Sequence, residues 1–320
     1  MRYVNSHNIE DAVIYGSVVM LGNFDGMHRG HLQLFDVLAQ QADACGLAKV
    51  VFSLWPHPLM HLKTGSAGFG LLLSSREKAR ILKELGTDVF VEYPFDDVLQ
   101  NMSPEIFVRE IILGKLRARA IVIGDDYAFG KNRQGDTAFL QDLGKKCGFD
   151  VHVVSAVTHG GQRVSSRTIR RHLGDRDLAL CNELMTRPYQ ISGLVMPGKQ
   201  LARHLGFPTI NIDPPPEKIL PPNGVYLTDT TIVELEYGQT YESITNVGIN
   251  PTVAGSKSTI KRCETYLYDF NEDIYGKEVI INFYESHRGE RVFKDIDALK
   301  RQIEIDVETG RKLWTKLRLQ

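Results

Sequence analysis

Two histidines in a glycine-rich stretch, His28 and His31, are the residues of this chain best suited to chemistry on a phosphate group. Residues 18–21 before them are apolar, as in a buried strand, and apolar side chains recur at helical spacing from His31 onward. The turn between such a strand and such a helix is a natural anion site, because backbone N–H groups point outward there and the helix dipole favours negative charge.

The composition of this turn favours a phosphate as the anion. Gly22, Gly26 and Gly30 let a phosphate approach the backbone closely, and imidazoles can donate to phosphate oxygens as negative charge shifts in a transition state. Two other interpretations remain, a chance pair at the start of a helix and a zinc pair. A zinc site would need a third ligand, and the neighbouring sequence supplies none.

The whole run from Gly22 to His31 resembles a known signature. It reads Gly-Asn-Phe-Asp-Gly-Met-His-Arg-Gly-His and is similar to the His-x-Gly-His motif of the nucleotidylyltransferase superfamily, in the form found in the adenylyltransferase domain of the bacterial riboflavin kinase/FAD synthetase family. The resemblance implies that His28 and His31 are catalytic. It also implies that the nucleotide is bound by Gly22, Asn23, Phe24, Asp25, Gly26 and Gly30.

The first half of the chain alternates predicted strands and helices. Helix start signals stand at Ser74 and Ser103, and the charges of the helix at 74–86 are expected to form a solvated face. Buried parallel strands are predicted at the apolar runs 49–54, 88–93, 120–124 and 151–154. This alternation predicts an α/β fold with a Rossmann-like, doubly wound parallel sheet, in a first domain of residues 1–186.

The stiff loop Pro56-His57-Pro58 follows the predicted strand at 49–54. By itself it is only a strand stop. The loop also resembles the Pro-His-Pro segment of the same family, which implies that His57 faces the nucleotide phosphates. The family usually has Phe-Glu before that segment, whereas this chain has Leu54-Trp55.

The polar and aromatic segment 125–135 follows the predicted strand at 120–124, which is where an open α/β sheet places ligand contacts. A surface turn is the alternative. The segment resembles the family motif Gly-x-Asp-Phe-x-Phe-Gly-x-x-Arg-x-Gly nearly throughout. The resemblance implies flavin contacts from Asp126, Tyr127, Phe129 and Arg133.

Hydroxyl groups followed by arginine stand at a further predicted helix start, 165–170. Such a start suits the β- and γ-phosphates of a nucleotide, although a plain serine cap has the same pattern. It resembles the Ile-Ser-Ser-Thr-x-Ile-Arg motif of the superfamily, with Arg167 in place of the third hydroxyl. The resemblance implies nucleotide contacts from Ser165, Ser166 and Arg170.

The second half of the chain, from Pro188, is rich in β-type segments separated by turn signals. A small closed antiparallel barrel in a second domain, 187–320, is predicted from the segments 189–195, 207–212, 224–233, 241–247, 264–269 and 278–284. A final helix at 295–317 is expected to pack on the barrel through a stripe made by Ile296, Leu299, Ile303 and Val307.

The glycine-studded segment 193–212 resembles the flavokinase signature, in which a flexible loop precedes Gly-Phe-Pro-Thr-Ala-Asn. Thr209 and Asn211 are two residues apart in an extended segment, so they share a face and can both reach a nucleotide-bound Mg²⁺. Ala202 and Ile210 depart from the family pattern. The resemblance implies that Thr209 and Asn211 hold the metal, and that the nucleotide is bound by Gly193, Gly198, Gly206, Pro208, Thr209 and Asn211.

Glu264 is the candidate general base of this second domain. The resemblance implies that it takes the proton from the flavin ribityl 5′-hydroxyl, and a carboxylate near that hydroxyl suits in-line phosphoryl transfer. The alternative for Glu264 is a glutamate that faces solvent from a strand. The alternative for Arg288 is an arginine in a surface ion pair. The resemblance further implies flavin contacts from Asn246, Leu267, Asp269 and Arg288.

Composition limits the class of protein. The 320 residues suffice for two domains with their own cores, and 42% hydrophobic with 24% charged residues is typical of a globular protein. A formal net charge of −1 argues against a nucleic-acid partner. Four cysteines without Cys-x-x-Cys spacing favour reduced thiols in a cytoplasmic protein. We expect no signal peptide and no membrane span. We expect the protein to be a monomer or a weak homo-oligomer.

Together, the motifs predict a bifunctional enzyme of FAD biosynthesis. By resemblance, the second domain phosphorylates riboflavin with ATP to give FMN, and the first transfers AMP from ATP to FMN to give FAD and pyrophosphate, with Mg²⁺ in both steps. Two alternatives remain. One is an enzyme with a single activity, suggested by Leu54-Trp55, Arg167 and Ala202; the other is a flavin-binding regulatory protein without turnover.

Overall fold

The computed structural model describes residues 1–13, 15–61, 69–198, 205–234, 238–251 and 259–318. The chain forms two compact units, Met1–Ser166 and Arg167–Gln320. Helices α7 (Ser166–Gly174) and α8 (Leu178–Met185) therefore belong to the second unit, apart from Ser166. Ala202, one of the departures from the family pattern, lies outside the described residues.

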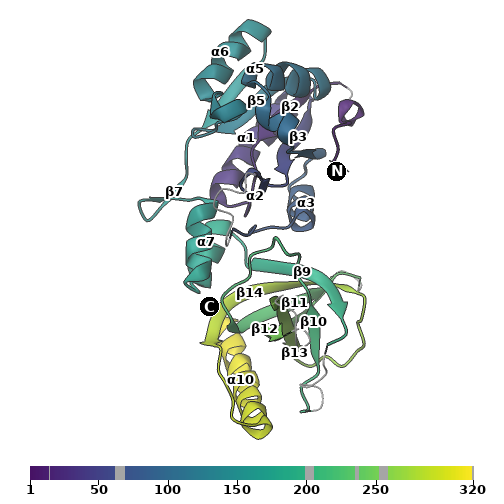
Figure 1. The fold of residues 1–320 in the computed structure, drawn as a ribbon, viewed down its shortest axis with the longest axis vertical. Coiled ribbons are helices and arrows are strands. Elements are labelled where there is room, and N and C mark those ends of the chain that lie inside the picture. The colour runs from purple at the N-terminus through teal and green to yellow at the C-terminus, as the bar shows by residue number, and fades with distance from the viewer. Residues whose placement is uncertain (14, 62–68, 199–204, 235–237, 252–258, 319–320) are drawn as a thin grey trace. The chain divides into compact units, whose positions relative to one another are not determined.

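A parallel sheet organises the first unit (Figure 1). In the described residues it has six strands in the order β1-β4-β3-β2-β5-β6. They are β1 (Arg2–Val4), β2 (Ser17–Leu21), β3 (Ala48–Trp55), β4 (Val89–Pro94), β5 (Ala118–Gly124) and β6 (Asp150–Val154). The predicted doubly wound sheet is confirmed. Its order reverses between β2 and β5, and ligands bind outside the carboxyl ends of the strands at such a switch point.

Helices cover both faces of this sheet. Helices α1 (Arg29–Cys45) and α3 (Ser75–Glu84) share one core cluster with alternate β2 side chains. The π-helix η2 (Phe107–Lys115) and α6 (Thr137–Cys147) share the other. The shorter elements are η1 (Glu10–Ala12), α2 (Pro58–His61), α4 (Asp97–Asn101), α5 (Pro104–Ile106), η3 (Lys131–Arg133), β7 (Thr158–His159) and β8 (Gln162–Arg163).

Helix α3 begins as its sequence predicts but buries charges that were expected to be solvated. The Ser74 hydroxyl accepts from the Glu77 N–H at 3.3 Å, and the Glu77 carboxylate accepts from the Ser74 N–H at 2.9 Å, so the helix starts with a capping box. The expected solvated face is wrong for Glu77 and Lys78, which are only 1% and 6% exposed. Lys78 is buried because its ammonium group pairs with Glu92 of β4, at 3.1 Å.

A closed antiparallel barrel organises the second unit (Figure 1). Its described strands follow the order β10-β13-β12-β11-β14-β9 and close through the pair β9 and β10. They are β9 (Tyr189–Met196), β10 (Thr209–Ile212), β11 (Gly224–Ile232), β12 (Gln239–Pro251), β13 (Thr259–Leu267) and β14 (Glu278–Gly289). The predicted barrel is confirmed.

A chain of hydroxyl groups runs through the barrel interior. Thr228 bonds to Ser243 and to Thr245, both at 2.8 Å, while Thr230 meets Ser243 at 2.9 Å and Thr265 meets Thr245 at 2.9 Å. All five residues are fully buried. Because a hydroxyl both donates and accepts, the groups can satisfy one another without water.

Helix α10 (Ile296–Leu317) packs on the outer wall of the barrel, but through its later turns. The expected stripe is wrong at Ile296, which is 58% exposed. Contact with the wall comes from Val307, Leu313 and Trp314. Gly310 lets the helix approach closely, since a Cβ there would lie 2.3 Å from the Tyr268 hydroxyl.

The described part of the chain contains no helix with the length and apolar character needed to cross a membrane. The four cysteines, all within the described residues, form no disulfide.

Candidate active sites

The loop after β2 forms the candidate nucleotide site of the first unit. Its backbone is anchored to β3, because the Gly22 N–H donates to the Phe52 carbonyl at 3.2 Å and the Ser53 hydroxyl donates to the Asn23 carbonyl at 3.3 Å. Phe24 has a φ of 50° and Met27 one of 38°, values that side chains other than glycine seldom adopt. Both side chains are buried, and that burial holds the strained loop in place.

The two histidines of this loop lie against each other. His28 is the N-cap residue of α1, so the helix begins earlier than the predicted start at His31. The two rings stack with centroids 3.7 Å apart, and the Phe24 ring meets His31 edge-on at 5.4 Å. A Cβ on Gly30 would lie 3.3 Å from the His28 ring. The imidazoles are therefore held together at the positive end of the α1 dipole.

Asp25 and Ser166 fix the far side of the loop. The buried Asp25 carboxylate accepts from the N–H groups of Leu72 and Leu73, at 2.9 and 3.1 Å, just before α3. The Ser166 hydroxyl donates to the Asp25 carbonyl at 2.7 Å. Thus the structure brings Ser166, predicted at a separate motif, to the backbone of Asp25 and next to Gly26.

His57, Ser165 and Arg170 are the other residues predicted to contact the nucleotide in the first domain. The His57 ring lies 5.0 Å from Phe69, and its Nδ1 atom accepts from the Leu59 N–H at 3.2 Å. Ser165 is half-buried and directly precedes Ser166. Arg170 lies on α7 in the second unit, so its assignment to the nucleotide site stays a prediction.

The segment after β5 closes on itself. Phe129 and Gly135 exchange two backbone hydrogen bonds, at 2.9 and 3.0 Å, and the Phe129 ring packs in the core between Phe107 and Phe139. Tyr127 stacks on Phe129 at 5.4 Å. Both aromatic rings therefore pack in or against the core of this unit, whereas Arg133 is exposed.

Asp126 of the same segment has a charged neighbour within the unit. The Arg163 guanidinium lies 3.0 Å from the Asp126 carboxylate and 2.7 Å from that of Asp125. These ion pairs tie the hairpin made by β7 and β8 to the carboxyl end of β5.

Four of the predicted residues of the second unit lie in one row across the barrel wall. Asn211 of β10 stands opposite Glu264 of β13, which stands opposite Asn246 of β12. Asn246 is in turn paired with Val225 of β11, and Val225 with Arg288 of β14. Directly opposite residues project from the same face of a sheet. Val225 belongs to the cluster under α10, so the row lies on the outer wall.

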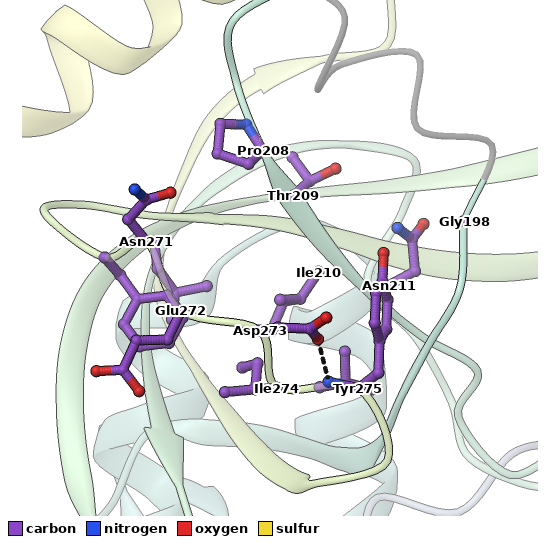
Figure 2. Close-up of a pocket in the computed structure, with 13 residues that line it drawn as sticks. Gly198, Pro208, Thr209, Ile210, Asn211, Asn271, Glu272, Asp273, Ile274 and Tyr275 are labelled. Carbon is purple, nitrogen blue, oxygen red and sulfur yellow. Dashed lines mark hydrogen bonds between the residues drawn. The ribbon is translucent and has the colours of Figure 1, made fainter.

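Thr209 and Asn211 also line a cavity of about 270 Å³. The same cavity is lined by a loop that includes Asn271, Glu272 and Asp273 (Figure 2). Gly198 lies so close that a Cβ there would come within 2.3 Å of the Asn211 amide. Further lining residues are Pro208 and Leu267. Gly193 lies against Ile212, and Gly206 has a φ of 94°.

Arg288 and Asp269 are both held by helix α10. The Asp306 carboxylate accepts from Arg288 Nη2 at 2.6 Å and from its Nε atom at 2.9 Å. Burial would raise the pKa of Asp306, but hydrogen bonds from His287, Arg288 and Gln302 outweigh it and lower the pKa to about 2. Asp269 pairs with Arg311 at 2.7 Å, on the exposed surface.

Asp306 and the cavity loop 271–273 are functional candidates that the sequence motifs do not predict. Asp306 interrupts the apolar stripe of the last helix. A charged residue on the packed face of a helix indicates that it has a partner of opposite charge. The loop carries Asn, Glu and Asp directly after a strand and a turn, a composition typical of ligand loops.

The donor atoms at the cavity fit Mg²⁺. Thr209 and Asn211 offer neutral oxygens in the lining of this cavity, and Mg²⁺ prefers oxygen ligands and usually keeps several waters. Across the described residues, no group of three or more His, Cys, Asp and Glu side chains could hold a metal ion. In particular, the structure adds no third ligand for a zinc site at His28 and His31.

Comparison with known proteins covers both units. A family model described as FAD synthetase matches residues 11–168, and one described as riboflavin kinase matches residues 185–314. The bifunctional riboflavin kinase/FMN adenylyltransferase of Escherichia coli K12 is 35% identical over 309 residues, which cover 96% of each chain. This chain belongs to the bifunctional riboflavin kinase/FMN adenylyltransferase family.

Other members and a solved structure agree with this family. The Haemophilus influenzae protein of the same name is 33% identical over 98% of this chain and 99% of its own. A crystal structure from Streptococcus pneumoniae, titled as a macrolide-efflux protein, is 28% identical, has a TM-score of 0.84, and matches over 97% of this chain and 99% of its own. Both matches therefore extend over both units of this chain.

Proposed function

We propose that this chain makes FAD from riboflavin in two ATP-dependent steps, one in each of the predicted domains 1–186 and 187–320. The carrying observation is the row on the barrel wall, which supports a kinase site built from Asn211, Glu264 and Arg288. The loop at His28 and His31 supports a separate nucleotidyl transfer site in the first unit. Membership of the family supports the assignment of riboflavin, FMN and ATP as substrates.

In the kinase step, Glu264 takes the proton of the riboflavin ribityl 5′-hydroxyl. The hydroxyl oxygen then forms a bond to the γ-phosphorus of ATP as the bond to the bridging oxygen breaks, which gives FMN and ADP. Thr209 and Asn211 would hold Mg²⁺, which neutralises phosphate charge when bound. Arg288, aimed by Asp306, and Asn246 would contact the flavin from the same wall.

In the transfer step, a phosphate oxygen of FMN attacks the α-phosphorus of ATP and pyrophosphate leaves. The FMN phosphate is already a nucleophile, so this site needs no strong base. His28 and His31 would donate to the phosphate oxygens, while the N–H groups of the loop after β2 and the start of α1 bind them. Because two stacked imidazoles lie 3.7 Å apart, both can reach one phosphate chain.

A cytoplasmic location is part of the proposal. The four cysteines are unpaired within the described residues, as is usual in a reducing compartment. Magnesium dependence of both steps is proposed on the oxygen donors of Thr209 and Asn211 and on the charge of the two substrates.

The test is an assay with riboflavin, ATP and Mg²⁺ in which riboflavin, FMN and FAD are separated by chromatography. We expect FMN to appear first and FAD to follow, and chelation of Mg²⁺ to stop both. Formation of FMN alone, with none of the supplied FMN converted to FAD, would contradict the proposal for the first unit. If neither riboflavin nor the supplied FMN is converted, the proposal fails as a whole in favour of a flavin-binding protein without turnover.

A further inference from the structure

A buried polar network lies beneath the candidate nucleotide loop of the first unit. The Lys78 ammonium group donates to the Glu92 carboxylate at 3.1 Å and to the Ser53 hydroxyl at 3.2 Å. The Tyr3 hydroxyl donates to the other Glu92 oxygen at 2.7 Å. The side chains of Lys78 and Glu92 are 8% and 1% exposed, so the network is shielded from water.

Stability alone does not account for this network. Removing two charges from water is costly, and buried ion pairs can often be replaced by apolar residues without loss of stability. The Phe90 ring lies 5.8 Å from the ammonium group and is an aromatic neighbour of the network. We therefore look for the role of the Lys78 charge in the groups that its ammonium contacts.

The direction of the hydrogen bonds shows what the charge does. An ammonium group has only donors, so Ser53 must accept from Lys78 and is left with its own proton to give. Ser53 gives that proton to the Asn23 carbonyl, at 3.3 Å. Lys78 therefore polarises a hydroxyl whose one remaining donor is committed to the loop after β2.

The orientation of the Asn23 carbonyl determines the direction of the next N–H group. A trans peptide is planar, and its C=O and N–H bonds point in opposite directions. When the Asn23 carbonyl is held against β3, the Phe24 N–H points away from the network. Phe24 has a φ of 50°, which is unfavourable for this residue type, so the peptide needs an anchor.

We propose that Lys78 is a positioning residue for adenylyl transfer: acting through Ser53, it holds the Asn23–Phe24 peptide so that the Phe24 N–H faces the nucleotide phosphates. This inference rests on the proposed transfer of AMP at the same loop. Two other contacts act in parallel, since Asp25 binds the N–H groups before α3 and Gly22 binds Phe52. Helix α3 and the residues just before it are thus joined to the loop at Asn23 and at Asp25.

The deciding variant is Ser53→Ala, which removes one oxygen and leaves Lys78 and Glu92 paired. We expect kcat for FMN adenylylation to fall about tenfold, because the Asn23 carbonyl loses its donor and the N–H behind it is no longer fixed. The KM for FMN should stay within about twofold, since the lost interaction acts mainly in the transition state. The kinase rate of the same sample measures the amount of folded protein independently.

Lys78→Met together with Glu92→Gln removes the charge without leaving a lone buried partner. We expect a loss of similar size, and no further loss when Ser53→Ala is added, because both changes break one connection. Lys83→Met, at an exposed position on the same helix, is the matched control and should leave both rates unchanged.

An unchanged kcat in Ser53→Ala would overturn the inference, as would losses that multiply in the combined variant. Even if the variant at positions 78 and 92 does not fold, Ser53→Ala decides. Failure of the wild-type chain to convert FMN to FAD would instead overturn the proposed transfer and this inference with it.

Discussion

The two candidate sites are built in different ways. In the first unit, most of the predicted residues come from one continuous run, Gly22 to His31, at the end of a strand and the start of a helix. In the second unit, Asn211, Glu264 and Arg288 come from three strands that are distant in sequence and are brought into one row by strand pairing. One site depends on local backbone geometry and the other on register.

This difference determines how each site can fail. A loop tolerates changes elsewhere as long as its anchors on β3 and α3 remain. A strand cannot slip, because a shift of one residue turns every side chain to the opposite face. In β13 such a shift would send Glu264 into the barrel interior and bring Cys263 or Thr265 to the outer wall.

The largest effect should come from Glu264→Gln, which removes the proposed base and keeps the shape of the row. We expect riboflavin phosphorylation to fall about 100-fold or more, as for other general bases. FMN adenylylation, measured on the same sample, should not change. Equal losses in both reactions would break the comparison, because the two sites would not be independent.

His31→Ala is the counterpart in the first unit. We expect adenylylation of FMN to fall about 100-fold, as when one donor to a developing charge is lost. Riboflavin phosphorylation should be unaffected. His7→Ala, which removes an exposed imidazole of the same unit, is the control and should leave both rates intact.

Asp306→Asn tests how firmly α10 is joined to the row. The pKa of Asp306 is lowered to about 2, so its carboxylate stabilises the folded unit above the ordinary carboxyl pKa, and this stability is lost as the pH falls towards 2. We expect the variant to be less stable by about 2 kcal/mol at neutral pH and equal to the parent near the lowered pKa.

Trp314 reports on this unit, and Trp55 on the other, so urea unfolding followed by fluorescence in a Trp55→Phe background isolates the effect. Glu308→Gln, on the exposed side of the same helix, is the matched control. A stability difference that persists unchanged to low pH would show that the Asp306 charge is not its cause.

The smallest effect is expected for Gly198→Ala. A Cβ there would lie 2.3 Å from the Asn211 amide and push it from its place, so the KM for ATP in the kinase step should rise roughly fivefold. Gly174→Ala, where a Cβ meets nothing within 4 Å, should be silent. An unchanged KM for Gly198→Ala would show that Asn211 has room to move within the cavity.

Much of the fold was predictable, because its signals are local. The Ser74 cap, the apolar strands and the loop at His28 are each visible within a dozen residues. The short edge strand β1 was not predicted, because its residues are mostly exposed and form no apolar run. Strands β12 to β14 are longer than predicted, and in β14 the reason is that its last residues, 285–289, are polar or glycine and form no apolar run.

What could not be predicted depends on partners that are distant in sequence. Lys78 looks like any surface lysine until Glu92 is placed beside it by the pairing of α3 and β4. Asp306 looks like a break in an apolar stripe until Arg288 meets it across the wall. The stripe itself was predicted too early, because Ile296 extends beyond the wall that Trp314 covers.

The hydroxyl chain inside the barrel limits which substitutions this domain can accept during evolution. Ser243 and Thr245 each meet two neighbours, so replacing Ser243 by an apolar residue takes away the hydroxyl that Thr230 contacts, and replacing Thr245 takes away the one that Thr265 contacts, both in a dry interior. Single replacements are therefore disfavoured, while a joint replacement of the whole set by apolar residues is not. We therefore expect relatives to keep all five residues or to exchange them together.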